Sequence, residues 1–560
     1  MDKIWLKYYQ KGVQHTIDPD SYESLVALFE EACQRYAHQV AYINFGSTLT
    51  YGQLDKASLA FARYLQQLGL KPGARVALMM PNILQYPIAL FGVLRAGLVV
   101  VNTNPLYKAH ELSHQLNNSG AEAIVVMANF ALTVEKALPS TNVNHVIITE
   151  LGDMFSPIKR WVMNAVNKYI KKGVPPYQIA NTLSWRKALQ LGGKGALKPV
   201  KLHSESLAFL QYTGGTNGVP KGAALTHRNM IANILQASAW ITPLQVGTKD
   251  LIVTALPLYH IFSLTANCLV FLKAGARNLL ITNPRDTRFF VRTIKKIQFT
   301  ALTGVNTLFN ALLHHPDFHR IDFSKLKLTL SGGMALQKSV ALKWGQLTKT
   351  RILEAYGLTE ASPAVSINPL YVEDYNGSIG LPLPSTEVSI RNDAEQEVPF
   401  GEAGELCVRG PQVMSEYWQA PEETHLVFTE DGFLKTGDIV KMDEEGFIYI
   451  VDRKKDMIDV SGFNVYPNEI EQVIAQHPGV FEVGVIGVTD KNGAERVKAC
   501  IVKRDPMLTA DSIIAYCKEH LTAYKVPKLI EFYKELPKTN VGKILRRALK
   551  EESTTENIPS

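Results

Sequence analysis

The chain has 560 residues, several times the length of a typical single domain, so we expect two or more domains. Hydrophobic residues make up 46% of it and charged residues 20%, which excludes a disordered or fibrous chain. The 59 Lys and Arg against 52 Asp and Glu give a net charge of +7, which suits anionic ligands or a membrane surface but is too diffuse to indicate nucleic acid binding.

The cysteines and the apolar stretches indicate a cellular compartment. Five cysteines lie far apart with no CxxC pair, which argues against a disulfide framework or a zinc site and favours a reducing environment. Residues 1–20 contain no apolar core of signal-peptide length. The longest apolar stretch, 87–101, is interrupted by Gly92 and Arg95 and falls short of the roughly 20 residues of a membrane span. We therefore expect a cytoplasmic protein, soluble or peripheral on the inner face of the cell membrane.

Buried strands alternate with helices through the N-terminal part of the chain. Continuous apolar runs predict strands at 76–80, 98–101, 123–127 and 146–149. Apolar residues at helical spacing predict helices over 51–68 and 84–96. A second series of strands is predicted at 207–212, 251–256, 279–282, 300–304 and 326–330. This alternation predicts two α/β subdomains, each built on a parallel sheet.

Residues 152–172 combine apolar and basic side chains at helical spacing. They include Trp161, Val162, Ala165, Val166, Tyr169 and Ile170 among Lys159, Arg160, Lys168, Lys171 and Lys172. A basic amphipathic helix can lie on anionic lipid, which supports contact with a membrane surface. The alternative, favoured on general grounds, is a surface helix whose apolar face packs on its own domain.

The pattern changes after residue 380, where prolines and glycines separate short strands. This sequence pattern is typical of a small antiparallel, β-barrel-like unit. The charged run 452–456 (DRKKD) is expected to be an exposed connector. A compact α+β tail follows, with strands near 483–488 and 498–503. We therefore divide the chain into an N-terminal domain (1–451), a connector (452–456) and a C-terminal domain (457–560).

A glycine-rich segment, YTGGTNGVPKG at 212–222, directly follows a predicted strand. Its glycines permit turns that present N–H groups to phosphate oxygens, while Thr213 and Thr216 add hydroxyl donors and Lys221 adds a cation. Its spacing differs from GxxxxGK[ST], which disfavours an ordinary P-loop kinase or GTPase. The alternative is a glycine-rich strand-to-helix turn that binds no ligand.

Further segments downstream carry reactive or polar groups. They are LPLYHIF (256–262), EAYGLTE (354–360), KTGD (435–438) and PKTNVGK (537–543). Each of them could be structural by itself. In this order, however, the motifs resemble those of the acyl-adenylate-forming superfamily, which includes acyl-CoA synthetases, luciferases and peptide-synthetase adenylation domains. The resemblance runs from Tyr22 to Leu549. Bacterial long-chain fatty acid–CoA ligases have similar sequences at the segments that correspond to 79–97, 279–286, 303–313 and 452–471.

This resemblance implies an α/β fold with a large N-terminal domain, made of two parallel-sheet subdomains and a small β-barrel-like unit, followed by a small, mobile α+β C-terminal domain. It implies ATP-dependent activation of long-chain fatty acids to acyl-CoA through an acyl-AMP, with release of AMP and pyrophosphate. ATP and CoA would be co-substrates and Mg²⁺ the cofactor, and a homodimer is left open. The C-terminal domain would rotate about Lys455 between an adenylation and a thioester-forming orientation.

The resemblance also assigns site residues. Those implied to bind ATP are Thr213, Gly214, Gly215, Thr216, Asn217, Gly218, Lys221, Gly222, Gly332, Gly333, Tyr356, Gly357, Thr359, Asp438, Arg453 and Lys543. Those implied to act in catalysis are Lys221, Thr359, Glu360 and Lys543, with Glu360 and Thr216 at the metal. The implied CoA channel contains Ser461, Gly462 and Phe463, and the implied acyl pocket contains His260, Thr303, Gly304, Phe309 and Met334.

Two positions depart from the family pattern. Asn217 stands in the phosphate-binding segment where the family usually has Thr or Ser. Because an amide still donates a hydrogen bond, we expect phosphate binding to be tuned or weakened. Asp459 stands where long-chain ligases tend to have an apolar residue and some relatives a lysine, and we have no physical explanation for it. Two other functions stay open: an acyl-AMP ligase that transfers the acyl group to a carrier protein, and a non-catalytic acyl or nucleotide sensor.

Overall fold

The first sheet of the computed structural model contains the strands expected early in the chain. The structure describes residues 3–213, 220–460, 463–489, 495–539 and 542–554. In spatial order the strands are β7 (Thr182–Ser184), β6 (His145–Thr149), β5 (Ala121–Met127), β3 (Arg75–Met79), β4 (Val99–Asn102), β8 (Leu207–Thr213) and β9 (Lys221–Thr226). Neighbours run parallel from β7 to β8, and β9 returns antiparallel to β8. The strands predicted before residue 150 are confirmed.

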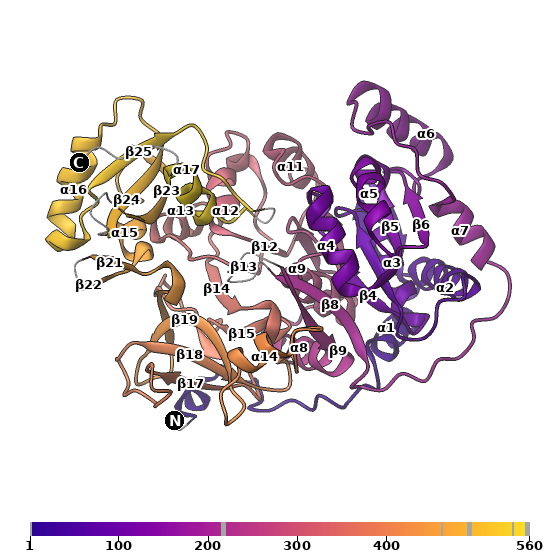
Figure 1. Ribbon diagram of the computed structural model, residues 1–560, viewed down its shortest axis with the longest axis horizontal. Coiled ribbons are helices and arrows are strands. Elements are labelled where there is room, and N and C mark those ends of the chain that lie inside the picture. Colours follow the sequence, from indigo (N-terminus) through magenta and orange to yellow (C-terminus); the bar gives the residue numbers. More distant parts are fainter. Residues whose placement is uncertain (1–2, 214–219, 461–462, 490–494, 540–541, 555–560) are drawn as a thin grey trace.

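Helices pack around this sheet (Figure 1). They are α1 (Leu25–Arg35), α2 (Tyr51–Gln67), α3 (Gln85–Arg95), α4 (Ala109–Ser119), α5 (Ala131–Ala137), α6 (Pro157–Ala165) and α7 (Trp185–Gly192). Helix α2 begins at a capping box between Thr50 and Gln53. Helices α2 and α3 approach closely, because a Cβ at Gly92 would stand 2.7 Å from the Phe61 ring. Both helices predicted here are confirmed.

The second sheet draws strands from two distant parts of the sequence. Its order is β16 (Leu381–Pro382), β15 (Ala364–Ile367), β14 (Ile352–Gly357), β13 (Leu328–Gly332), β12 (Ala301–Gly304), β10 (Leu251–Thr254), β11 (Arg277–Leu280), β1 (Val40–Asn44) and β2 (Ser47–Thr50). Its helices are α8 (His227–Trp240), α9 (Ile261–Ser263), α10 (Val270–Lys273), α11 (Thr287–Ile294), α12 (Asn306–Leu313) and α13 (Lys338–Thr348).

The membership of one strand differs from expectation. The run 207–212 was expected to open the second sheet, but it is β8 of the first sheet and pairs with β4. The N-terminal strand β1 pairs with β11 in the second sheet instead. The apolar pattern predicts a buried strand correctly, but it carries no information on which neighbour that strand will bond.

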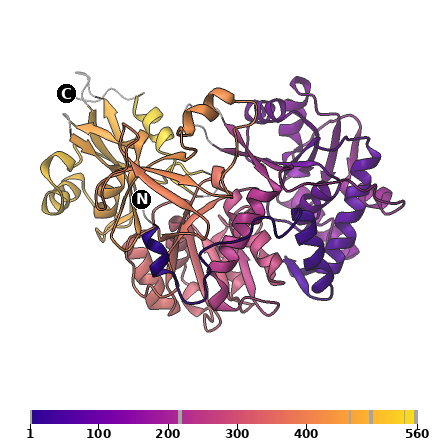
Figure 2. The ribbon, with the colours of Figure 1, turned by 90° about the horizontal axis from the view of Figure 1, so that it is seen from below.

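The expected antiparallel unit follows. Its order is β17 (Glu387–Arg391), β18 (Gly404–Arg409), β19 (Leu434–Met442) and β20 (Ile448–Arg453), and α14 (Pro421–Val427) lies between β18 and β19 in the chain. The N-terminal turn η1 (Ile4–Tyr8) packs on this unit, as Figures 1 and 2 show. Lys3 pairs with Glu387 at 2.7 Å, and a Cβ at Gly446 would meet Trp5.

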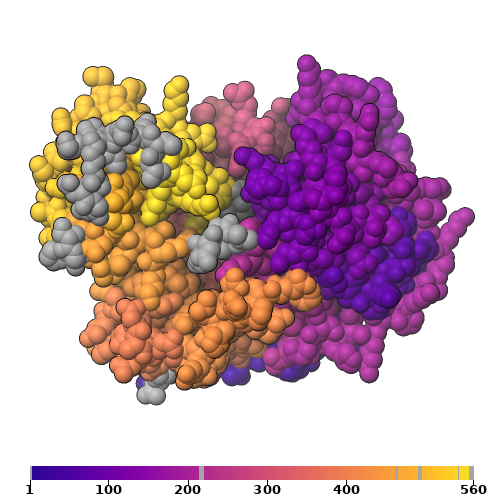
Figure 3. Space-filling view, viewed as in Figure 1, coloured from indigo at the N-terminus to yellow at the C-terminus, as the bar shows by residue number. Residues whose placement is uncertain are grey.

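The C-terminal part has its own hydrophobic cores. Its strands are β21 (Ile458–Val460), β22 (Phe463–Val465), β23 (Val480–Thr489), β24 (Glu495–Lys503) and β25 (Leu529–Tyr533), and its helices are α15 (Pro467–Ile474), α16 (Ala510–His520) and α17 (Arg546–Thr554). The strands expected near 483–488 and 498–503 are confirmed as parts of β23 and β24. In Figure 3 this yellow part lies directly above the orange antiparallel unit. The turn η9 (Lys454–Asp456) connects β20 to β21.

Several short turns complete the fold. They are the 3₁₀ turns η2 (Ala128–Phe130), η3 (Leu138–Ser140), η5 (Thr242–Leu244), η7 (Phe318–Arg320), η8 (Thr359–Ala361) and η10 (Ala523–Lys525), together with the π-helical segments η4 (Val166–Ile170) and η6 (Leu264–Leu269). Within the described ranges, every helix is too short or too polar to cross a bilayer.

Candidate active site

A cavity of about 1330 Å³ opens where the second sheet, the antiparallel unit and the C-terminal part meet. The strands β12, β13 and β14 are parallel, so their carboxyl ends lie at one edge of the sheet. That edge is where open α/β sheets bind ligands. Thr303, Gly332 and Tyr356, near the ends of these strands, all line the cavity.

The two described ends of the glycine-rich segment lie at this cavity on antiparallel strands. Thr213 of β8 pairs with Lys221 of β9 in an antiparallel register, and both residues line the cavity. The segment between them therefore joins two strands, and the strand-to-helix turn considered above is wrong. Gly214, Gly215, Thr216, Asn217 and Gly218 lie outside the described residues.

The first two residues of β9, Lys221 and Gly222, contact aromatic neighbours. The Lys221 ammonium lies 5.4 Å from the centre of the Tyr417 ring and 4.0 Å from Glu423 Oε1. The Gly222 carbonyl accepts a hydrogen bond from Trp418 N–H at 2.7 Å, and a Cβ at Gly222 would stand 3.1 Å from the Tyr212 ring. A side chain at Gly222 would therefore require the Tyr212 ring to shift by a few tenths of an ångström.

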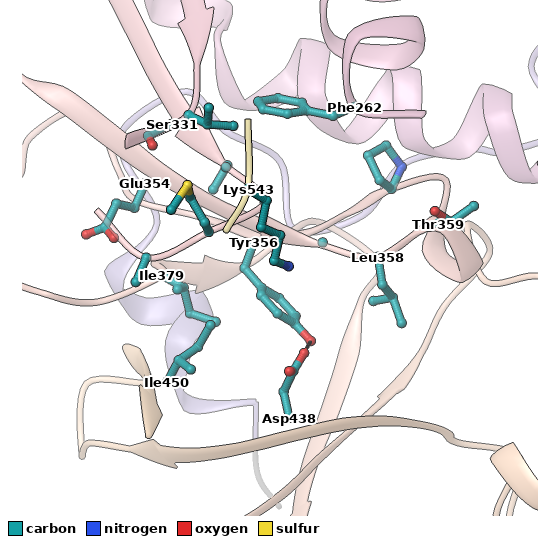
Figure 4. Close-up of a pocket in the computed structure, with 18 of the residues that line it drawn as sticks. Phe262, Ser331, Glu354, Tyr356, Leu358, Thr359, Ile379, Asp438, Ile450 and Lys543 are labelled. Atoms are coloured by element: carbon teal, nitrogen blue, oxygen red, sulfur yellow. Dashed lines mark hydrogen bonds between the residues drawn. The ribbon is translucent and has the colours of Figure 1, made fainter. Parts of the chain in front are cut away.

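Two residues that line the cavity, Tyr356 and Asp438, are joined by a direct hydrogen bond. Tyr356 Oη donates a hydrogen bond to Asp438 Oδ2 at 2.6 Å (Figure 4). Burial, followed by the charge of Asp438, raises the pKa of Tyr356 well above its usual value. Asp438 and Arg453 are cross-strand partners on β19 and β20, so sheet register places them side by side.

Three glycines shape this part of the wall. A Cβ at Gly332 would stand 3.0 Å from the Ala355 carbonyl oxygen, and one at Gly357 would overlap the Pro363 carbonyl. Gly333 has φ +80°, a left-handed conformation that favours glycine. Gly332, Gly333 and Gly357 all line the cavity.

Thr359 and Glu360 lie on the turn η8, which follows β14. Glu360 Oε1 accepts a hydrogen bond from Tyr417 Oη at 2.6 Å, and the Glu360 carbonyl accepts one from Met414 N–H at 2.7 Å. Burial raises the pKa of Glu360. Both residues line the cavity, and a carboxylate and a hydroxyl are the hard oxygen donors that Mg²⁺ prefers beside substrate phosphates.

The C-terminal part contributes Lys543 to the same cavity. Figure 4 shows its side chain extending beside Tyr356. Its backbone is held by Thr539, whose N–H donates to the Lys543 carbonyl at 2.7 Å and whose Oγ1 accepts from Lys543 N–H at 3.1 Å. Thr307 Oγ1 of α12 donates to the Gly542 carbonyl at 2.8 Å. Burial, reinforced by the charge of Arg453, lowers the pKa of Lys543 to about 7.

The predicted acyl-pocket residues divide into two groups. His260, Thr303 and Met334 line the cavity, and burial lowers the pKa of His260 to about 4. Gly304 and Phe309 are not among its lining residues. Phe309 is fully buried in the core behind the cavity, and the centres of its ring and of the Trp344 ring are 5.0 Å apart. The Phe309 ring also packs against Gly304.

Other cavity residues escaped sequence reasoning. An apolar branch is lined by α8, η6 and α10 through Ala237, Trp240, Ile241, Ala266, Val270 and Phe271. Glu354 also lines the cavity, and burial raises its pKa to about 8. Tyr417 carries no motif of its own and was missed for that reason. The sequence signal for the cavity residues of α8 was the helical spacing of its apolar residues.

The predicted hinge and CoA-channel residues are only partly described. Lys455 lies in the turn η9 and lines the cavity. Ser461 and Gly462 lie outside the described residues, and Phe463 begins β22.

Comparisons with known proteins identify the class. The AMP-binding enzyme family matches residues 29–418, and the AMP-binding enzyme C-terminal domain matches residues 469–543. The chain therefore belongs to the AMP-binding enzyme family. A long-chain-fatty-acid--CoA ligase of Salmonella typhimurium is 57% identical over 554 residues, covering 99% of each chain. One of Haemophilus influenzae is 52% identical over 557 residues, again covering 99% of each chain.

Solved structures share the fold. A benzoate CoA ligase from Burkholderia xenovorans LB400 superposes with a TM-score of 0.81 at 25% identity, covering 94% of this chain and 99% of that one. The anthranilate CoA ligase AuaEII, in complex with anthranoyl-AMP, gives a TM-score of 0.84 at 24% identity, covering 96% of this chain and 100% of that one. The expected family and fold class are thus confirmed.

Proposed function

We propose that this chain is an ATP-dependent long-chain fatty acid–CoA ligase that acts through an acyl-AMP. The observation that carries the proposal is the position of Lys543, which reaches the same cavity as Tyr356, Asp438 and Glu360. The identity of 57% over nearly the whole chain to a long-chain-fatty-acid--CoA ligase supports the substrate class.

In the first step, a carboxylate oxygen of the fatty acid attacks the α-phosphorus of ATP, and the bond to the bridging oxygen of pyrophosphate breaks. No proton is transferred, so catalysis depends on positioning and on charge stabilisation. Tyr356 stacks on the adenine, Gly332 and Gly333 line it, and Asp438 and Arg453 bind the ribose hydroxyls. Those five residues fix the nucleotide.

The remaining groups act at the phosphates. Thr213, the segment 214–218 and Lys221 hold the β- and γ-phosphates of the leaving group. Thr359 and Lys543 contact the α-phosphate, and the ammonium of Lys543 also attracts the incoming carboxylate. Glu360, together with Thr216, would hold Mg²⁺, which when bound would supply positive charge beside the phosphates.

In the second step, the CoA thiolate attacks the acyl carbonyl and AMP leaves. This step requires residues 457–560 to turn against residues 1–451 about the hinge 452–456, at Lys455. Ser461, Gly462 and Phe463 then border the pantetheine channel, and Lys543 withdraws. Hinges of this kind consist of a few residues that absorb a backbone change.

The experiment mixes the protein with ATP, Mg²⁺ and oleate, and measures pyrophosphate, then adds CoA and measures oleoyl-CoA. The proposal expects both products. Pyrophosphate without oleoyl-CoA would support transfer to a carrier protein, and neither product would support a sensor. Rates with acids from C6 to C18 then define the preferred chain length.

We further propose that α6 and η4 dock on an anionic membrane. The packed-helix alternative does not hold for four of its apolar residues, since Ile158, Trp161, Tyr169 and Ile170 are 81%, 73%, 70% and 74% exposed. This segment projects from the first sheet at the edge of the molecule (Figure 1). Lys168, Lys171 and Lys172 are exposed on the same segment and complement anionic headgroups. The protein would then be peripheral on the inner face of the membrane.

A further inference from the structure

We infer that Asp452 and Arg546 form a latch across the hinge that positions Lys543 for acyl-AMP formation. The inference rests on the proposed function, because it assumes that residues 457–560 change orientation between the two half-reactions. It adds residues that hold one of these orientations, and neither contacts the reacting atoms in the scheme above.

Arg546 lies at the start of α17, shortly after Lys543. Its guanidinium donates to Asp456 Oδ2 at 3.0 Å, Glu471 Oε1 at 2.9 Å and Asn468 Oδ1 at 2.6 Å, and it lies 3.5 Å from Asp452 Oδ1. Only 16% of its side chain is exposed. Burial opposes its charge, but Glu471, Asp452 and Asp456 together raise the pKa of Arg546. The guanidinium therefore stays charged within this cluster.

Asp452 is the first residue of the hinge segment and precedes the pivot Lys455; it lies near the end of β20, beside Arg453. Its side chain is 0% exposed. Oδ2 accepts a hydrogen bond from Asn468 N–H at 2.8 Å, in the first turn of α15, and Oδ1 accepts one from Arg453 N–H at 2.7 Å. The same carboxylate thus ties β20 to two helices of the C-terminal part.

Rotation about Lys455 affects these contacts unequally. Asp456, Asn468 and Glu471 follow Lys455 in the chain, so they turn together with Arg546. Asp452 precedes Lys455 and stays with β20. Rotation therefore separates Asp452 from Arg546 and from Asn468 N–H, and a buried carboxylate that loses its partners is costly. The contact favours the orientation seen here.

Lys543 is consequently held from both sides of its loop. Thr307 binds the Gly542 carbonyl just before it, and the latch fixes Arg546 just after it. A small displacement of a catalytic group slows a reaction that depends on precise positioning. Loss of either the Thr307 contact or the latch should therefore slow acyl-AMP formation specifically.

The test is Asp452→Asn, which keeps the shape of the side chain. Both carboxylate oxygens accept N–H bonds, so the new amide NH₂ must face a donor. We expect single-turnover acyl-AMP formation from ATP and oleate to slow at least about tenfold, with KM for ATP changed less than about threefold. Thioesterification of preformed oleoyl-AMP should stay within about twofold of wild type or become faster.

Two further variants separate positioning from general stability. Arg546→Lys keeps the charge but loses the planar fork, so it should retain more adenylation than Arg546→Gln. Lys525→Gln is the matched control, because Lys525 pairs with Glu469 of α15 at 2.7 Å without crossing the hinge. It should leave the ratio of the two half-reactions unchanged.

Melting curves identify folded variants, and Arg546→Lys serves if Asp452→Asn does not fold. Equal losses in both half-reactions, or unchanged adenylation, in a folded variant would overturn the latch. A wild-type protein that releases no pyrophosphate would instead contradict the proposed function, so the two failures are distinguishable.

Discussion

At the scale of single residues, the pKa of Lys543 makes its charge in the cavity depend on pH. An ammonium deep in the cavity loses water, and this loss, reinforced by Arg453, brings its pKa to about 7. In the proposed mechanism the charged form of Lys543 binds the α-phosphate, whereas the neutral form lacks the charge that the transferring group needs. As pH rises through about 7, the free enzyme therefore loses the competent form.

We predict that kcat/KM for ATP in pyrophosphate release falls with rising pH, by about tenfold per pH unit well above 7. The cause is deprotonation of Lys543 in the free enzyme. Lys543→Arg, which stays charged, should be slower at pH 6.5 but nearly flat from pH 6.5 to 8.5. The same decline in Lys543→Arg would assign the titration to another group.

A second prediction concerns the phenol that supports Glu360. Tyr417→Phe removes the 2.6 Å hydrogen bond and leaves the carboxylate oxygen less stabilised. A hydrogen bond to a charged group is worth about 1.5–3 kcal/mol, so the Mg²⁺ concentration for half-maximal adenylation should rise about tenfold or more.

The matched control is Tyr449→Phe, which removes a 3.0 Å bond to Asp443 in the same antiparallel unit. It should leave the Mg²⁺ dependence unchanged. An unaltered Mg²⁺ requirement in folded Tyr417→Phe would mean that Glu360 does not hold the ion.

At the scale of elements, α6 and η4 differ from the other helices near the first sheet. One side is attached to the domain, where Asn167 is buried and donates to Asn129 Oδ1 at 2.9 Å. The opposite side exposes aromatic and aliphatic residues next to lysines. Soluble proteins rarely expose such a patch without a partner.

We predict that changing Lys168, Lys171 and Lys172 to Glu weakens sedimentation with anionic vesicles by at least about tenfold, because each basic residue near such a surface contributes about 1 kcal/mol. Wild-type binding should weaken with added salt. Changing exposed Lys518, Lys528 and Lys534 to Glu alters the net charge equally and should have little effect. Equal effects of both sets would indicate general charge attraction without a docking helix.

At the scale of the whole molecule, two half-reactions have to use one cavity. Lys543 occupies it here, and the turn η9 is the covalent path along which the C-terminal part could move. Within a 3₁₀ turn φ lies near −50 to −70°, which matches the φ of proline.

We predict that Lys455→Pro preserves the present orientation and blocks the turn. Acyl-AMP formation should remain within about tenfold of wild type, while thioester formation falls at least about 100-fold, a barrier increase of roughly 2.7 kcal/mol. Lys455→Ala, which keeps backbone freedom, should retain both half-reactions. Parallel losses in folded Lys455→Pro would contradict a hinge at this residue.

The sequence by itself determined the family, the alternation of strands and helices, and the part of the cavity lining that lies in recognisable motifs such as 354–360 and 435–438. Register then completes local pairs: Asp438 meets Arg453 because β19 and β20 are consecutive strands.

Only the tertiary structure decided contacts between distant segments. It placed β8 beside β4, brought Tyr417 to Glu360, buried Phe309 behind the cavity and exposed Trp161. Hydrophobic periodicity reports that a side chain is buried or exposed on its own element, but the choice of neighbour depends on packing across the whole chain. The pairing of Asp452 with Arg546, 94 residues apart, arises from that packing.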